Sequence, residues 1–135
     1  MLTIIDASVA VKWFLQGEVG REAALIVLDK IKDKPSFYAV PDLFFSEMLH
    51  VLCRIFSDAG EIEDYVSSLL DLGINVLRTG KETLLLAITF AKKNGLSGYD
   101  AIYAANAKLV KGVWLTADQQ AHRKIASLNF SRCLS

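Results

Sequence analysis

The sequence lacks several features that mark particular classes of protein. Only two cysteines and two prolines occur in its 135 residues. No internal repeat, low-complexity tract or linker interrupts the chain. Cys53 and Cys133 have no metal-ligand spacing, so we expect reduced thiols that behave as small hydrophobic side chains. A disulfide framework and a cysteine-based zinc site are therefore not predicted.

Long hydrophobic runs and an excess of charge are also missing. No segment approaches the roughly 18 apolar residues of a membrane span. The short apolar run at the start ends at Asp6, too soon for a secretory signal. Fifteen basic and fifteen acidic residues cancel, so the overall charge does not indicate nucleic-acid binding, although it is compatible with a local basic patch. We expect a cytoplasmic protein that does not enter the membrane.

Apolar residues are abundant instead. They make up 53% of the chain, above the usual range of about 45–50%. A chain of this length fits one domain, residues 1–135, that buries a sizeable core without disulfides or metals. We expect the surplus to be covered by a second copy in a homodimer. The large side chains that we assign to this surplus, each near a helix end, are Trp13, Phe14, Phe44, Phe45 and Phe56.

Short apolar segments alternate with helical patterns along the whole chain. Segments rich in β-branched or aromatic residues predict strands at 2–5, 37–40, 74–77, 113–116 and 130–133. Apolar residues at helical spacing predict helices at 9–15, 21–32, 41–56, 62–72, 81–93, 97–111 and 119–128. This alternation predicts a three-layer α/β/α sandwich with a mainly parallel sheet and the strand order 3-2-1-4-5.

The segment 95–118, GLSGYDAIYAANAKLVKGVWLTAD, carries the most informative functional pattern. Ser97 and Asp100 form a capping box that opens a helix, and Asp118 follows a predicted strand. Asp6 follows the first strand in the same way. With the order 3-2-1-4-5, the switch point falls between the first and fourth strands, so Asp6 and Asp118 flank the crevice where open α/β sheets bind ligands.

Each acid also has a purely structural interpretation. Asp6, Asp100 and Asp118 are all predicted at helix starts, where such side chains commonly act as caps. Glu47 lies on the helix at 41–56 near polar His50, and there it is compatible with a position facing water. Spacing alone leaves both interpretations open.

Carboxylates gathered at one sheet edge without lysine or arginine repel one another. At 4 Å the repulsion is about 1 kcal/mol per pair in water and about 4 kcal/mol near a protein surface. A hard divalent cation relieves it, and Mg²⁺ takes oxygen ligands while leaving positions for substrate phosphate. Such a site predicts phosphodiester hydrolysis. The hydroxyls of Ser8 and Thr116 are candidates for orienting the ligands, although hydroxyls at such positions more often serve turns and caps.

Four segments of the chain together resemble the PIN-domain family: DASVAVKWFL around Asp6, VPDLFFSEMLHVL around Glu47, LSGYDAIYAANA around Asp100 and LTAD around Asp118. The resemblance extends over nearly all of the sequence and is greatest to VapC-type toxin ribonucleases of prokaryotic toxin–antitoxin pairs. It implies an endoribonuclease that depends on Mg²⁺ or Mn²⁺, with Asp6, Glu47, Asp100 and Asp118 as its catalytic and metal-binding acids. It also implies a dimer that an antitoxin protein holds inactive.

The chain departs from this family pattern at two places. Relatives often have Asn three residues after the helix glutamate, where this chain has His50, which puts the hydrogen bonding around Glu47 in question. Some relatives add an acid soon after the position of Asp118, whereas Gln119 and Gln120 follow here. We therefore expect one bound ion rather than two.

Three other functions are compatible with parts of the sequence. His50 and His122 could serve as a metal-free acid and base, but their placement on polar helix stripes gives this little support. A signalling receiver domain would have a paired acid after the first strand and a lysine closing the fifth, and neither is present. The stronger alternative is a catalytically inactive PIN-like module that binds RNA or protein.

Overall fold

Five strands form one sheet in which every neighbouring pair is parallel. The computed structural model describes residues 1–135. The strands are β1 (Thr3–Ile5), β2 (Tyr38–Pro41), β3 (Asn75–Leu77), β4 (Val113–Thr116) and β5 (Ser131–Cys133). Their order is β3-β2-β1-β4-β5, which confirms the predicted order 3-2-1-4-5.

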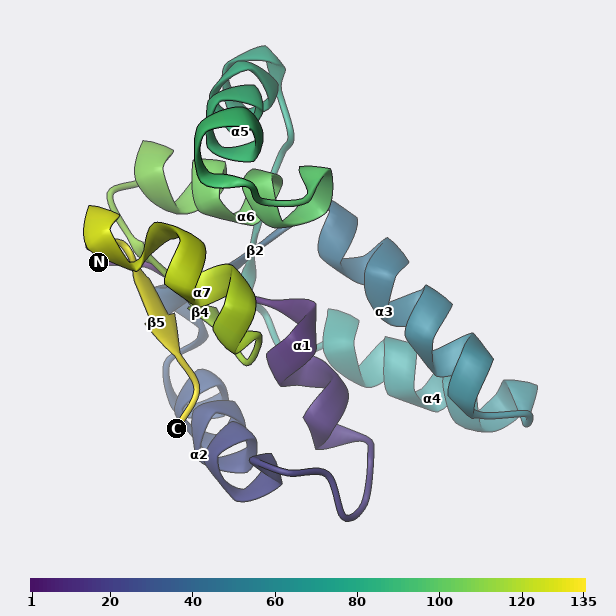
Figure 1. Cartoon of the computed structure of the whole chain (residues 1–135). Coiled ribbons are helices and arrows are strands. Elements are labelled where there is room, and N and C mark those ends of the chain that lie inside the picture. The colour runs from purple at the N-terminus through teal and green to yellow at the C-terminus, as the bar shows by residue number, and fades with distance from the viewer.

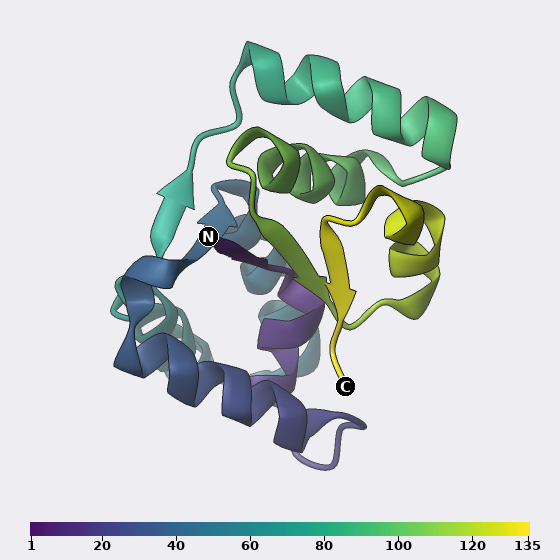
Figure 2. The ribbon, with the colours of Figure 1, turned by 90° about the vertical axis from the view of Figure 1, so that its left-hand side faces the viewer.

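Helices cover both faces of this sheet and complete the three layers (Figures 1 and 2). One face packs against α1 (Ala7–Ala10), α2 (Arg21–Asp33), α3 (Leu43–Ile55) and α4 (Ala59–Leu70). The other face packs against α5 (Lys81–Asn94), α6 (Gly98–Leu109) and α7 (Gln119–Ile125). In Figure 2 the sheet lies between α5 and α6 above and α2 below.

Successive residues of a strand point to opposite faces of the sheet. The central strands therefore contribute side chains to two separate cores. Ile4 and Trp114 are fully buried on the face of α5, α6 and α7. Ile5 and Leu115 are buried on the face of α1 to α4. Since β1 and β4 are in register at these residues, the two central strands are buried on both faces.

Most helices lie within a few residues of their predicted bounds, and local hydrogen bonds explain the larger differences. The helix predicted at 9–15 is α1 followed by a 3-10 turn at Val11–Trp13, a common way for a helix to tighten at its end. The helix predicted at 62–72 starts three residues earlier, because the Asp58 carboxylate accepts a hydrogen bond from Glu61 N at 3.0 Å. The helix predicted to end at Leu128 changes to a 3-10 turn after Ile125.

A glycine permits the close pairing of β1 and β4. A Cβ atom added at Gly112 would lie 2.3 Å from Leu2 O. The next residue, Val113, donates its N–H to the same carbonyl at 3.0 Å. A larger residue at position 112 would force the two central strands apart, because the obstacle is backbone.

Two of the five large side chains of the apolar surplus, some of which we expected a second copy to cover, lie in the monomer core instead. Trp13 and Phe44 are buried. Phe14 and Phe56 each pack on Tyr65 of α4, with ring centroids 4.8 Å and 5.2 Å apart. Phe14, Phe45 and Phe56 remain partly exposed, and α4, which packs beside α3, supplies Tyr65 as a neighbour for two of these rings. The exposed apolar residues lie elsewhere, for example Leu84, Leu85 and Ile88 on α5.

The remaining compositional expectations concern the thiols and the membrane. Both cysteines are free. Cys53 is exposed on α3 rather than packed as a hydrophobic residue, because it lies on the outward side of that helix. None of the helices has the length and apolar content needed to cross a membrane.

Candidate active site

Two of the predicted acids lie at the carboxyl ends of the central strands. Asp6 follows β1 directly, and its backbone N–H donates to Leu115 O of β4 at 3.0 Å. Asp118 lies two residues beyond β4. Because β1 and β4 are adjacent and parallel, both acids lie at the same sheet edge, where chains leaving the two strands turn to opposite faces.

Ser8 and Thr116 connect the two segments that carry these acids. Ser8 Oγ accepts a hydrogen bond from Ala117 N at 2.9 Å and lies 3.3 Å from Thr116 Oγ1. Thr116 Oγ1 accepts from Asp118 N at 3.1 Å. The two hydroxyls therefore fix the turns after β1 and β4 relative to each other.

Three of the acids take part in helix caps. Asp6 accepts from Ser8 N at 2.9 Å, and Asp118 accepts from Ala121 N at 3.1 Å. Asp100 donates its N–H to Ser97 Oγ at 3.2 Å. Capping thus accounts for one carboxylate oxygen of Asp6, one of Asp118 and the N–H of Asp100, but it does not explain why the three carboxylates lie near one another.

The negative charges of the four acids act on one another. Burial raises the pKa of Asp6, and the charge of Asp118 adds to this shift. Burial, with the charges of Asp6 and Asp118, raises the pKa of Asp100 to about 6. Burial likewise raises the pKa of Glu47 to about 7, with further contributions from Asp6 and Asp100. Each of the four carboxylates therefore lies within electrostatic range of at least two others.

Sequence reasoning missed two aromatic residues that bind these acids. Tyr103 OH donates to Glu47 Oε1 at 2.7 Å, and Trp114 Nε1 donates to Asp6 Oδ1 at 3.0 Å. Burial beside Asp6 and Glu47 raises the pKa of Tyr103, which keeps the phenol protonated as a donor. One signal was available in the sequence: a Trp in a buried strand needs an acceptor for its N–H, and acids were the candidates.

No lysine or arginine forms an ion pair with any of the four acids. The salt bridge of the molecule joins Lys12 to Glu18 at 3.7 Å. Lys124 lowers the pKa of Asp100 through its charge, but its ammonium donates to Gly95 O at 3.0 Å. The site therefore keeps an excess of negative charge.

The donor set suits a hard divalent cation, because it consists of carboxylate oxygens without a protein counter-ion. No three acidic, histidine or cysteine side chains are close enough to hold a metal ion as they stand. Binding an ion would therefore draw the carboxylates inward. The chemistry of these side chains fits a divalent metal ion, but their spacing requires the carboxylates to move before they can bind one.

A groove of about 630 Å³ opens beside Glu47. Its walls come from α3 and the start of α6, and it is lined by Leu43, Ser46, Glu47, His50, Val51 and Tyr99. The other histidine has different surroundings, since His122 Nδ1 lies 2.8 Å from Ser131 Oγ. The two imidazoles therefore do not share this groove.

A family model and several solved structures are similar to this chain. The PIN-domain family model matches residues 3–128. VapBC2 from Rickettsia felis, bound to a DNA fragment from its promoter, superposes with a TM-score of 0.76 at 10% identity over 100% of both chains. A toxin–antitoxin complex from Klebsiella pneumoniae gives 0.71 at 15% identity, covering 96% of this chain and 95% of the other. VapBC-1 from nontypeable Haemophilus influenzae gives 0.70 at 14% identity, covering 99% and 98%.

These structural likenesses, at such low identity, show a shared fold alone. No curated protein sequence matches the chain. The family match spans almost the whole sequence, including all four acids. The chain belongs to the PIN-domain family.

Proposed function

We propose that this protein is a metal-dependent endoribonuclease that hydrolyses phosphodiester bonds of RNA. PIN domains are generally nucleases that use divalent metal ions. One observation carries the proposal for this chain. Four carboxylates from different elements lie within electrostatic range at one sheet edge, and none has an ion-pair partner.

Asp6, Asp100 and Asp118 are the residues that would hold Mg²⁺ or Mn²⁺, and Glu47 would contribute through a water molecule. When bound, the ion polarises phosphoryl oxygens and makes water a better nucleophile. Glu47 has a second task that needs no metal. Its carboxylate has a pKa of about 7, so it suits proton exchange with a reacting group near neutral pH.

The proposed substrate is single-stranded RNA. Glu47 lines the groove itself, and Tyr99 in its wall is 65% exposed. An exposed aromatic ring gives an unpaired base a surface on which to stack. Tyr99 directly precedes Asp100, so a base held there would keep its phosphate near the acids.

The proposed protein partner is an antitoxin of a VapBC-type pair, which would place the protein in the cytoplasm. Apolar side chains line a groove of about 320 Å³ between α3 and α4, among them Leu49, Ile62 and Val66. Such a groove fits the apolar face of a helix. A basic side chain elsewhere on the antitoxin would complement the charge of the acids.

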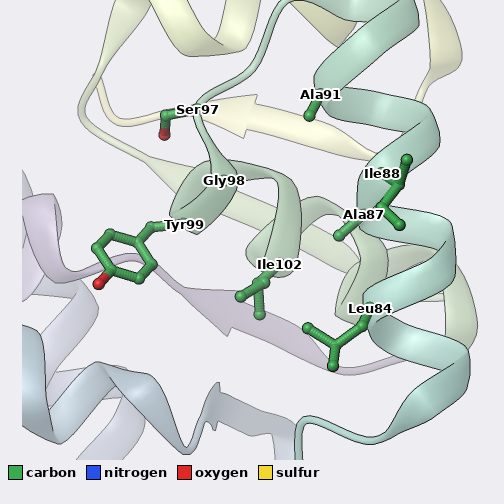
Figure 3. Close-up of a pocket in the computed structure, with 8 residues that line it drawn as sticks. All are labelled: Leu84, Ala87, Ile88, Ala91, Ser97, Gly98, Tyr99 and Ile102. Carbon is green, nitrogen blue, oxygen red and sulfur yellow. The ribbon is translucent and has the colours of Figure 1, made fainter.

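We also propose a homodimer, on a surface other than the one expected from the sequence. A groove of about 510 Å³ lies between α5 and the start of α6, and Figure 3 shows the side chains that line it. Its lining includes Leu84, Ile88 and Ile102, and exposed Leu85 extends the apolar surface along α5. A second copy would cover this face. Light scattering that gives a monomer mass at micromolar concentration, without an antitoxin, would contradict this proposal.

The second candidate function is a PIN-like module that binds RNA or protein without cleaving it. The observation that favours it is the spacing of the acids, since no three of them are close enough to hold an ion as they stand. The two functions differ in what happens when metal is added.

A cleavage assay separates them. Single-stranded RNA is incubated with the protein in Mg²⁺, in Mn²⁺ and in excess chelator. We expect internal cleavage with either ion and none with chelator. If the RNA is bound in the presence of either ion but is not cleaved, the protein is a binding module and not a nuclease.

A further inference from the structure

Two buried aromatic residues connect all four elements that carry the acids. Tyr103 lies on α6, which also carries Asp100, and it reaches Glu47 of α3. Trp114 lies on β4, which leads to Asp118, and it reaches Asp6 at the end of β1. Each aromatic residue thus lies on an element that carries or leads to one acid and donates a hydrogen bond to a different acid. Figure 1 shows the start of α6 close to the start of α3.

The two rings also hold each other in place. Their centroids are 6.2 Å apart, and their planes differ by 18°. Both residues are almost completely buried. A stacked and buried pair has little freedom to turn, so the atoms that donate to the acids have fixed positions.

Neutral donors suit carboxylates that must bind a cation. A buried carboxylate without a hydrogen bond is costly, so each acid needs a donor. Lysine or arginine would supply one but would also cancel the charge that attracts the metal. The phenol and the indole satisfy one oxygen of Glu47 and one of Asp6 and leave the negative charge in place.

We propose that Trp114 and Tyr103 are positioning residues: each anchors one carboxylate oxygen, of Asp6 and of Glu47, and so limits how far these acids must move to bind a divalent cation, Asp6 directly and Glu47 through water. This inference rests on the proposed function of the acidic site. Hydrogen-bond partners of metal ligands typically contribute 10–100-fold to metal affinity, so their loss is measurable.

The chain supplies a matched control for each residue. Tyr65 OH donates to Glu61 Oε1 at 2.7 Å, the same contact and distance as Tyr103 to Glu47. Trp13 Nε1 donates to Ala24 O at 2.8 Å in the core on the other face of the sheet. These controls lose a similar hydrogen bond away from the acids.

The first measurement is calorimetric titration with Mg²⁺ of the full-length protein and four variants. We expect Tyr103→Phe and Trp114→Phe to bind Mg²⁺ about 10–100-fold more weakly than the unchanged protein. We expect Tyr65→Phe and Trp13→Phe to bind it with unchanged affinity. Circular dichroism confirms that each variant is folded.

The second measurement uses fluorescence, because the chain has two tryptophans. In Trp13→Phe the emission comes from Trp114 alone, whose indole bonds an acid of the site. We expect this emission to change as Mg²⁺ is added, with a midpoint at the same Mg²⁺ concentration as in the calorimetric titration. In Trp114→Phe the emission comes from Trp13, and we expect no change.

The outcomes separate this inference from the proposed function. If the unchanged protein binds Mg²⁺ and cleaves RNA, but Tyr103→Phe binds like Tyr65→Phe and the Trp114 emission stays constant, the positioning role alone is overturned. If the unchanged protein binds no Mg²⁺, both are overturned. If Trp114→Phe does not fold, the Mg²⁺ affinity of Tyr103→Phe and the emission of Trp13→Phe still test the positioning role.

Discussion

Asp6 and Asp42 occupy the same place after neighbouring parallel strands but have opposite electrostatic surroundings. Each directly follows its strand and donates its N–H to the next strand, Asp6 to Leu115 O at 3.0 Å and Asp42 to Leu77 O at 2.9 Å. Asp6 is only 6% exposed, and burial raises its pKa. Asp42 is exposed, and hydrogen bonds from Thr79 lower its pKa.

The pKa values of Asp6 and Asp42 differ because different side chains surround the ends of β1 and β2. β1 is the middle strand of the sheet, and the elements around its end bring Trp114, Asp118 and Asp100 toward Asp6. β2 lies beside the edge strand β3, and the Asp42 carboxylate there accepts hydrogen bonds from the N–H and the hydroxyl of Thr79, two residues beyond β3. A carboxylate after a parallel strand therefore becomes part of an acidic site only where several elements converge.

The largest expected effect is on RNA cleavage. Asp6→Asn removes a negative charge and a ligand from the site, so we expect cleavage to fall by orders of magnitude. Asp42→Asn makes the same chemical change at the other strand end, and we expect unchanged cleavage. Rates are measured on folded protein in Mg²⁺. If Asp6→Asn and Asp42→Asn lost cleavage activity equally, Asp6 would have no special role compared with Asp42.

A smaller effect is expected in the pH dependence of stability without metal. Glu47 and Asp100 have raised pKa values of about 7 and about 6, so the folded state binds more protons than the unfolded chain between about pH 4 and 7. Stability from these groups is therefore greatest at low pH and is lost as the pH rises through that window. Urea unfolding at pH 5 and pH 8 measures it, and Glu47→Gln should reduce the difference.

Asp42 should contribute with the opposite sign. Its lowered pKa means that its stabilisation is present above the pKa of the unfolded chain and is lost as the pH falls through the folded value. Asp42→Asn should therefore weaken the loss of stability in acid. If Asp42→Asn instead altered the decline between pH 5 and 8, the assignment of that decline to the acidic site would be wrong.

The smallest effect is expected from the hydroxyl that links the two central turns. Ser8→Ala leaves Ala117 N without its acceptor, so we expect a loss of about 0.5–1.5 kcal/mol of unfolding free energy. Cleavage should fall much less than in Asp6→Asn. Ser68→Ala is the control, because its hydroxyl donates to Asp64 O on exposed α4. A loss of cleavage as large as that of Asp6→Asn would make Ser8 part of the catalytic machinery.

The sheet and the places of the acids could be predicted because they follow from local sequence. Apolar strands bounded by turn residues, such as 113–116 after Gly112, fix the alternation of strands and helices. The alternation in turn predicts a parallel sheet. Asp6 and Asp118 were recognisable because each closely follows such a strand.

The contacts that distinguish the site could not be predicted in the same way. Trp114 and Asp6 are 108 positions apart in the chain, and Tyr103 and Glu47 are 56 apart. No periodicity links residues at such separations. The contacts of Phe14 and Phe56 with Tyr65 have the same cause, because they depend on where α4 packs.

The most direct test of the acidic site is the effect of Mg²⁺ on the melting temperature of Asp100→Asn. A ligand that binds the folded state stabilises it in proportion to its affinity, and this variant removes one charge from the cluster without a change of shape. We expect metal-free melting to stay level or rise, and Mg²⁺ to raise the melting temperature less than in the unchanged protein. Asp42→Asn should show the full increase. An equal Mg²⁺-induced increase in Asp100→Asn and the unchanged protein would contradict a metal site formed by these acids.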